Sequence, residues 1–287
     1  MRRLFEVDVH LHAGLERNVD LDYLVDWAVL DGRKILALID HDFLYWREPR
    51  EFEAWLRRER LTRNYPRGVE GLKKFYSDVA RQRERWRGET MIFQAIEVFN
   101  EKLGQKGFKA LPEEVFKGLD IFALEVRTYG DQPGAGAILR EWVLRLDELC
   151  KEKDLVGVLC HPFMYTVEKF YRRGEINRAN LKAGLIYLPE ELAAFTDGLR
   201  LERVFIEVNW SIIARLYRDY YRLFEMVANA FKILRDAGLS FSLGSDLHKY
   251  PPVIPYRPDG PYREMGLSPE DFGIIEALEE RYSRLYS

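Results

Sequence analysis

Five histidines are the residues best suited to chemistry in this chain, and each lies at the end of an apolar run. His10 and His12 close the run LFEVDVHLH, and the runs ILALID, LVGVLC and FSLGSD precede His41, His161 and His248. Histidine is the commonest metal ligand, and its unperturbed pKa lies nearest neutrality. If the runs are strands of one sheet, the five side chains meet at one edge and form a single polar site.

Carboxylates accompany the histidines at the same positions. The polar residues at the ends of these and neighbouring runs are Asp8, Asp40, Glu97, Glu125, Arg127, Glu207, Asn209 and Asp246. Side chains alternate along a strand with period two, so His10 and His12 share a face. Asp246 and His248 repeat this spacing, and Glu97 has two oxygens with which to bridge two ions. Imidazoles mixed with carboxylates suit Zn²⁺, Mn²⁺ or Fe²⁺, so we predict a metal site.

Seven apolar runs predict the strands that position these residues. They cover residues 4–9, 34–39, 91–97, 119–126, 155–160, 202–208 and 239–244. Segments with helical spacing separate them, and such alternation indicates a parallel sheet covered by helices. Seven such units predict a closed or nearly closed α/β barrel. A doubly wound open sheet is the alternative.

Helical periodicity is clearest in three segments between the strands. The apolar positions are Leu21, Leu24, Val25 and Ala28, then Leu139, Val143, Leu146 and Leu149, and then Leu216, Leu223, Val227 and Phe231. A final helix is expected over 269–284, because Ser268 is a capping residue and Pro269 suits a first helical position.

Two stretches interrupt this rhythm. Residues 43–90 exceed the length of one crossover helix, so we predict a helical insertion in a single domain spanning 1–287. Residues 249–262 form a proline-rich loop. Within the insertion, residues 47–87 contain 13 Lys+Arg and 7 Asp+Glu together with Trp55, Phe75, Tyr76 and Trp86. Such a segment either binds nucleic acid or forms a solvated pair of helices whose aromatic side chains point toward the protein interior.

Composition describes a globular protein without strong net charge. Charged residues make up 32% and the formal net charge is −3, so acids and bases are balanced, as in heat-adapted proteins rich in ion pairs. Cys150 and Cys160 form neither a metal-binding spacing nor a disulfide framework. We expect two buried thiols, with Cys160 facing away from the site because it precedes His161 on one strand. The chain has no run of 18 apolar residues and no apolar leader, so we expect a soluble cytoplasmic protein without a membrane partner.

Six short motifs, in their order along the chain, resemble those of the PHP family, named for polymerase and histidinol phosphatase. They are Asp8-Val9-His10-Leu11-His12, Ile39-Asp40-His41, Ile96-Glu97-Val98, Cys160-His161-Pro162, Glu207-Val208-Asn209 and Gly244-Ser245-Asp246-Leu247-His248. The resemblance covers residues 8–248. It implies a distorted seven-stranded (β/α) barrel with two or three divalent metals, and many members of that family hydrolyse phosphoesters.

The resemblance also implies how the ligands divide among the metals. One ion would be bound by His10, His12, Glu97 and Asp246, a second by His41 and His248, and a third or bridging position by Glu97 and His161. Two departures concern the third metal. Many members have a histidine or aspartate where this chain has Asn18, near Asp20 and Asp22, and members with three metals have a histidine at the fourth strand end, where this chain has Glu125 and Arg127.

The leading functional hypothesis is a metal-dependent phosphoesterase that uses metal-activated water. Asp246, Glu97 and Arg127 are the candidate catalytic residues, with a carboxylate handling the proton. Arg17, Arg127 and Lys249 are candidates to hold the phosphate oxygens. The expected substrate is a phosphorylated small molecule or nucleotide, with nucleic acid as an alternative through residues 47–87.

Two other functions stay open. An amidohydrolase-like barrel that cleaves C–N bonds also begins with a His-x-His motif, but Glu207, Asn209 and the final Asp-x-His weigh against it. A nucleic-acid-binding barrel with a reduced catalytic role is the third reading.

Overall fold

The structure is a computed structural model of the chain and describes residues 4–13, 21–41, 54, 57, 65–164, 166–167, 186–247 and 259–287. Seven parallel strands form one sheet in the order of the sequence. They are β1 (Val7–His12), β2 (Ile35–His41), β3 (Met91–Phe99), β4 (Ile121–Glu125), β5 (Val156–Cys160), β6 (Val204–Asn209) and β7 (Phe241–Gly244). All seven predicted strands are therefore present.

The two edge strands of this sheet approach each other. Leu11 of β1 and Leu247, just beyond β7, form a parallel bridge. The Asp246 backbone N–H donates to the His10 carbonyl at 2.8 Å, and the Ser245 N–H donates to Asp8 Oδ1 at 2.9 Å. The sheet is thus a nearly closed barrel, which confirms the predicted fold and excludes the open doubly wound alternative.

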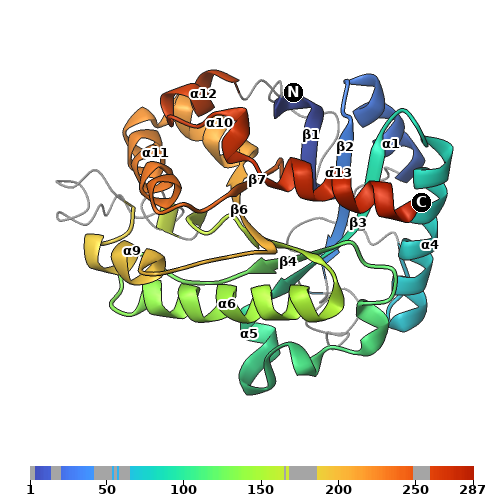
Figure 1. Cartoon of the computed structure of the whole chain (residues 1–287), viewed down its shortest axis with the longest axis horizontal. Coiled ribbons are helices and arrows are strands. Elements are labelled where there is room, and N and C mark those ends of the chain that lie inside the picture. The colour runs from blue at the N-terminus through green and yellow to red at the C-terminus, as the bar shows by residue number, and fades with distance from the viewer. Residues whose placement is uncertain are drawn as a thin grey trace.

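Helices surround the strands on the outside (Figure 1). They are α1 (Leu21–Leu30), α4 (Val69–Arg85), α5 (Asn100–Leu103), α6 (Ala135–Lys153), α9 (Pro189–Thr196), α10 (Trp210–Asp219), α11 (Tyr221–Asp236), α12 (Asp259–Glu264) and α13 (Ile274–Leu285). Short 3₁₀ segments are η1 (Leu4–Glu6), η2 (Gly104–Ala110), η3 (Glu113–Val115) and η4 (Pro269–Asp271). None of the described helices is both long and apolar enough to cross a bilayer.

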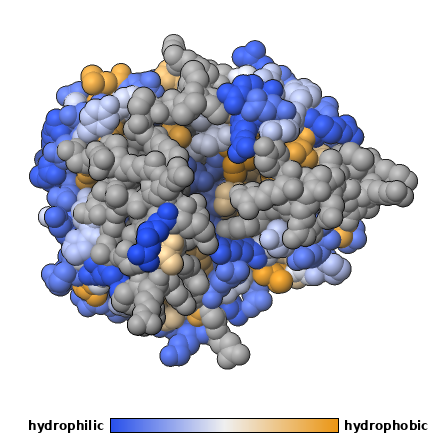
Figure 2. All heavy atoms as spheres, turned by 180° about the vertical axis from the view of Figure 1, so that it is seen from behind, coloured by the Kyte–Doolittle hydropathy of each residue, from blue (hydrophilic) through white to orange (hydrophobic). Residues whose placement is uncertain are grey.

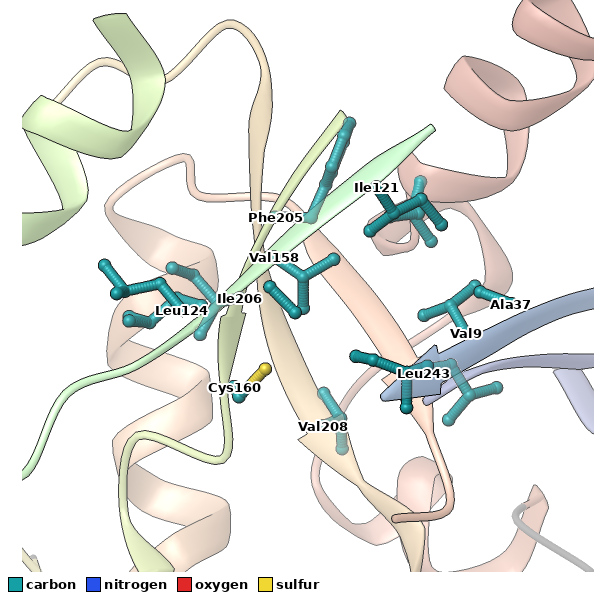
Figure 3. Packing of buried hydrophobic residues seen from close by; sticks show 14 of the residues in the cluster. Val9, Ala37, Ile121, Leu124, Val158, Cys160, Phe205, Ile206, Val208 and Leu243 are labelled. Carbon is teal, nitrogen blue, oxygen red and sulfur yellow. The ribbon is translucent and has the colours of Figure 1, made fainter. Parts of the chain in front are cut away.

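The interior of the barrel explains the unbroken apolar runs of the sequence. Every residue of the seven strands is buried, as expected for parallel strands covered on both faces. Side chains from several strands pack together in this core (Figure 3). Helix α13 lies against the amino ends of β4 and β5, where Arg281 donates to Asp120 Oδ1 at 2.9 Å and to the Leu119 carbonyl at 2.9 Å. The carboxyl ends of the strands lie at the opposite side of the barrel.

The predicted helical insertion lies partly outside the described residues. Its described carboxyl-terminal part is α4, which packs on β3 with Phe75 and Tyr76 buried. Arg81 and Arg85 of this helix form ion pairs with Asp22 and Asp26 of α1 at 2.9 and 2.8 Å. Among the described residues, α4 is therefore the ordinary crossover helix between β2 and β3, with its aromatic side chains inward.

Three predicted boundaries were wrong. Residues 4–6 form η1 rather than the start of β1. The apolar positions from Leu216 to Phe231 lie on two helices, because Tyr220 leaves helical geometry with φ −145° and ψ 56°. The predicted helix 269–284 is divided into η4 and α13, because Phe272 has φ −97° and ψ 66°. The capping box of Ser268 with Asp271 is present, but it opens η4.

A glycine on α6 sets how closely α9 can approach. A Cβ atom at Gly136 would lie 1.8 Å from the Glu191 carbonyl oxygen, and the Gly136 N–H donates to Glu191 Oε2 at 2.8 Å. We expect Gly136→Ala to lower the free energy of unfolding by about 1–3 kcal/mol or more, because neither backbone has room to move. Gly260→Ala is the control, since no atom lies within 4 Å of its Cβ. Equal urea midpoints for the two variants would contradict this close contact.

Candidate metal centre

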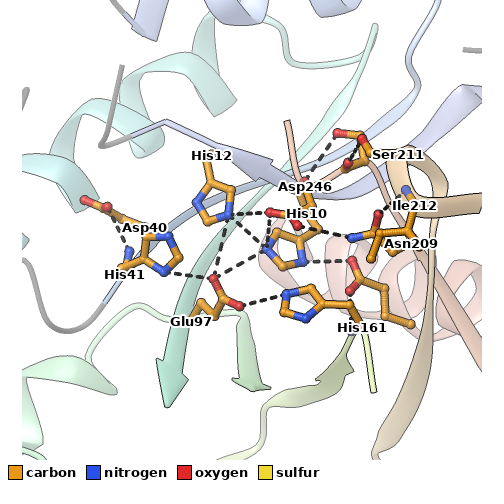
Figure 4. A network of polar contacts seen from close by, with 12 residues as sticks. His10, His12, Asp40, His41, Glu97, His161, Asn209, Ser211, Ile212 and Asp246 are labelled. Carbon is orange, nitrogen blue, oxygen red and sulfur yellow. Dashed lines mark hydrogen bonds and ion pairs between the residues drawn. The ribbon is translucent and has the colours of Figure 1, made fainter. Parts of the chain in front are cut away.

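The first group of candidate ligands joins the first and last strands of the barrel. The Nε2 atoms of His10 and His12 lie 3.1 Å apart, and His12 Nε2 lies 3.1 Å from Asp246 Oδ1. His10 Nε2 is 3.8 Å from the same oxygen. Atoms that each bind one Zn²⁺ at about 2.0–2.1 Å lie roughly 3.3 Å apart in a tetrahedral arrangement. The three side chains therefore converge at a spacing that suits one divalent ion (Figure 4).

Glu97 lies at the centre of the described histidines. Its Oε2 is 2.9 Å from His41 Nδ1, 3.6 Å from His10 Nε2 and 3.7 Å from His12 Nε2. Its Oε1 is 3.2 Å from His161 Nε2. Glu97 is only 1% exposed, so a carboxylate is buried among four imidazoles that come from β1, from β2 and from the residue just after β5. Its two oxygens face different histidines, which is the geometry that a bridging ligand needs.

The third group of candidate ligands contains Glu125, a carboxylate that the sequence predicts at a strand end but does not mark as a metal ligand. Glu125 ends β4, and one of its oxygens lies within 4.8 Å of ligand atoms of Glu97 and His161. Burial and the charge of Glu97 raise the pKa of Glu125 to about 7. The signal that could have identified Glu125 was its position, because it is the last residue of a strand, like His12 and His41 on their strands.

Backbone strain is concentrated at this site. Three non-glycine residues in the described part of the chain have positive φ, and two of them are His161 at 26° and Asp246 at 53°. Such conformations cost of order 1–3 kcal/mol each and persist only where neighbouring contacts hold them. Both residues follow the last residue of a strand, so the strained turns redirect candidate ligands back over the barrel.

The close packing of acids and imidazoles shifts their pKa values. Burial lowers the pKa of His161, but contacts with Glu97, Asp246 and Glu207 outweigh it and raise that pKa to about 10. Burial also opposes the charge on His10, yet the Glu207 carboxylate and its neighbours raise the His10 pKa well above its usual value. Burial raises the pKa of Glu97, but His41 and His10 hold it well below its ordinary range. The carboxylates of the site thus favour positive charge on the neighbouring imidazoles.

Two polar residues hold the last motif in place. Asn209 caps α10 by accepting the Ile212 N–H at 3.1 Å, and its amide donates to Asp246 Oδ2 at 3.4 Å. Asp8 accepts the N–H groups of His10 and Ser245 at 3.2 and 2.9 Å. Asp8 therefore links the two edge strands.

Cys160 corrects one prediction. It is buried, as expected, but its Sγ lies within 4.8 Å of ligand atoms of His10, His161 and Glu207, so it does not face away from the site. In Figure 3 its side chain points from β5 toward the side on which Val208 lies. The expected alternation fails because β5 ends at Cys160 and His161 turns with positive φ. The thiol therefore lies beside the candidate ligands, where burial raises its pKa.

Arg127 lies at the rim of the site and is held by acids. Its Nε donates to Glu125 Oε1 at 3.0 Å, and its Nη1 lies 3.2 Å from Glu101 Oε2. The guanidinium carbon also lies 4.5 Å from the centroid of the Phe99 ring. The other predicted residues of this end, Arg17, Asn18, His248 and Lys249, lie outside the described residues.

The site is on the side of the molecule opposite α13. Seen from that side, the surface is hollowed near its middle, with both hydrophilic and hydrophobic described residues at the border (Figure 2). A small apolar pocket of about 20 Å³ adjoins the site and is lined by His161, Met164, Asn209, Ile212 and Phe231 among others. The candidate ligands thus lie toward the carboxyl ends of the strands, where active sites of (β/α) barrels are found.

Comparisons with known proteins support the fold. No family model matches the chain, and no curated protein matches it. A solved structure of the putative histidinol phosphatase from Listeria monocytogenes is similar to 84% of this chain and 95% of its own, with a TM-score of 0.53 and 15% identity. Histidinol phosphate phosphatase from Lactococcus lactis, solved with zinc, L-histidinol and phosphate, covers 96% of this chain and 93% of its own, with a TM-score of 0.48 and 13% identity. The chain therefore has a barrel of the kind that the motif resemblance implied.

Proposed function

We propose that this chain is a metal-dependent phosphoesterase of the PHP family. The observation that carries the proposal is the convergence of six candidate ligands at the carboxyl ends of five strands. They are His10, His12, His41, Glu97, His161 and Asp246. The motifs that contain these residues resemble those of that family, and the likeness of the fold to a putative histidinol phosphatase agrees with it.

The proposed metal positions follow the three groups of side chains. The first is His10, His12 and Asp246, and Glu97 lies between it and the other two. The second contains His41 and Glu97, and we propose that His248 completes it. The third contains Glu97 and His161, with Glu125 in the place where related proteins with three metals have a histidine. Imidazole and carboxylate donors suit zinc, manganese or iron. The third group contains two carboxylates and therefore has the largest share of hard oxygen donors.

The side chains of the site have separate roles in this proposal. Divalent ions bound there would supply a water of lowered pKa and neutralise the phosphoryl oxygens. Asp246 would bind an ion through Oδ1, which faces His12 at 3.1 Å, so Oδ2, to which the Asn209 amide donates, is the oxygen left to accept a proton from the water. Glu97 orients the histidines. Arg127, with Arg17 and Lys249, binds the non-reacting phosphate oxygens, and Arg127 must exchange part of its contact with Glu125 and Glu101 for the substrate.

The proposal is tested by metal analysis and a substrate panel. The purified protein is expected to contain divalent metal by inductively coupled plasma analysis. It should hydrolyse phosphomonoesters such as histidinol phosphate and nucleoside monophosphates, or the diester bis(p-nitrophenyl) phosphate. Amides and lactones should be inert. Turnover of amides or lactones without phosphoester hydrolysis would favour the amidohydrolase-like reading, and a metal-loaded protein inert toward every phosphoester would overturn the proposal.

A further inference from the structure

Glu207 joins two candidate ligands from different strands. It lies on β6 with 0% exposure. Its Oε1 is 2.8 Å from His10 Nδ1, and its Oε2 accepts the backbone N–H of His161 at 2.7 Å. Both oxygens are engaged in these contacts, so in this arrangement Glu207 holds two candidate ligands, His10 and His161.

The contact with His10 determines which ring nitrogen faces the site. A carboxylate accepts hydrogen bonds, so the neutral, metal-binding form of the His10 ring carries its proton on Nδ1 and leaves the Nε2 lone pair available. That Nε2 points toward His12 Nε2 at 3.1 Å and Glu97 Oε2 at 3.6 Å. Ligand histidines are commonly held in this way by a carboxylate on the opposite ring nitrogen.

The contact with His161 supports a strained backbone. His161 has φ 26°, a conformation that β-carbon-bearing residues rarely adopt. The Glu207 carboxylate accepts the N–H of this residue, while its ring reaches Glu97 Oε1 at 3.2 Å. Loss of the acceptor would leave a buried N–H unpaired and would release the turn that presents His161.

Gly244 shows how tightly Glu207 is held. A Cβ atom at Gly244 would lie 2.2 Å from Glu207 Oε1 and 2.3 Å from His10 Cβ. Only glycine lets β7 approach both residues at once. Gly244 therefore allows β7 to pack directly against Glu207 and His10.

We propose that Glu207 is a positioning residue that fixes the tautomer of His10 and the backbone turn of His161 for metal binding. The inference rests on the proposed metal centre. It predicts that glutamine cannot replace Glu207, because an amide has one acceptor oxygen while two N–H donors point at this side chain. One of the donors would then face the amide NH₂ group.

The experiment compares two buried glutamates that make the same kind of contact. Glu191 on α9 is also buried and lies away from the candidate ligands. Its oxygens accept the Gly134 and Gly136 N–H groups at the start of α6, at 2.7 and 2.8 Å. Wild type, Glu207→Gln and Glu191→Gln are titrated with Zn²⁺ against a chromophoric chelator. Glu207→Gln should bind Zn²⁺ about 10–100-fold more weakly, while Glu191→Gln should bind like wild type even if both variants lose stability.

A second readout needs no metal. In the metal-free protein, at a pH high enough to leave the His10 ring neutral, ¹⁵N NMR of the imidazoles should show the His10 proton on Nδ1 in wild type and in Glu191→Gln, and a loss of that preference in Glu207→Gln. If wild type binds no metal, the proposed function fails while the tautomer still tests the role of Glu207. Wild-type Zn²⁺ affinity with an unchanged His10 tautomer in Glu207→Gln would overturn the inference.

A shorter carboxylate serves if Glu207→Gln does not fold. Glu207→Asp keeps an acceptor-only group but is one methylene too short to reach both donors. It should keep the Nδ1 proton on His10 and bind Zn²⁺ with an affinity between those of wild type and a full loss. Affinity equal to wild type in Glu207→Asp would contradict a role that depends on spanning both ligands.

Discussion

Glu97→Gln is expected to lower kcat/KM for phosphoester hydrolysis by about a thousandfold or more. Lewis-acid stabilisation by bound metal is worth several kcal/mol, and each 1.4 kcal/mol is about tenfold in rate. Substitution of Glu97 should cause the largest loss of this stabilisation, because its two oxygens approach four histidines within 2.9–3.7 Å. Glutamine has nearly the same shape but removes the negative charge and turns one acceptor into a donor facing an imidazole.

Steady-state kinetics and metal analysis of the same samples check this prediction. Glu191→Gln is the matched control, since it removes a buried carboxylate on α9 that accepts two backbone N–H groups. It should keep wild-type kcat/KM and metal content. A Glu97→Gln protein with both wild-type activity and a full complement of metal would show that Glu97 is not a bridging ligand.

Removal of metal is expected to lower the melting temperature by about 5–10 °C. A ligand present at 100 times its Kd stabilises the folded state by about 2.7 kcal/mol, and a domain of this size loses roughly 2–4 °C per kcal/mol. Without cations, the carboxylates of Glu97, Glu125 and Asp246 repel one another in a buried cavity. Divalent ions held by His10, His12, Glu97 and Asp246 would offset that repulsion.

Differential scanning calorimetry before and after dialysis against EDTA measures the effect. Activity should be lost with the fall in melting temperature, and both should return when Zn²⁺ or Mn²⁺ is added. An unchanged melting temperature after complete removal of metal, with activity retained, would mean that the buried cluster is held by hydrogen bonds alone.

Much of the barrel could be predicted because its strands are buried on both faces. Such strands appear in a sequence as unbroken apolar runs, and all seven runs are strands. Boundaries were predicted less well where a single backbone conformation decides them. The break between α10 and α11 depends on Tyr220, and the break after η4 depends on Phe272. Neither tyrosine nor phenylalanine is a residue type that predicts the end of a helix.

The candidate ligands could be predicted because they occupy strand ends. His10, His12 and Glu97 lie within strands whose alternation is regular enough to read from the sequence. The prediction for Cys160 failed because His161 lies beyond β5 with positive φ, which a rule based on alternation does not include. The supporting role of Glu207 depends on contacts with residues 197 and 46 positions away, and spacing along the chain carries no information about them.

The role of the basic residues in segment 47–87 also could not be predicted without the three-dimensional structure. Its charge excess suggested nucleic acid, but Arg81, Arg83 and Arg85 pair with acids on neighbouring elements, with Asp22, Asp120 and Asp26 respectively. These ion pairs assign the described part of the segment to holding α4 against the barrel. Nucleic-acid binding remains a prediction for residues of the segment outside that part.

The most direct test of the central claim is an anomalous-difference map from crystals of the metal-loaded protein, measured at the absorption edge of the bound metal. The account predicts one peak among His10 Nε2, His12 Nε2 and Asp246 Oδ1, and a second peak bounded by Glu97 and His41. A third peak beside Glu97, Glu125 and His161 would place Glu125 where related proteins have a histidine. A map with metal bound to the protein but no peak within coordination distance of Glu97 or His10 would contradict the account.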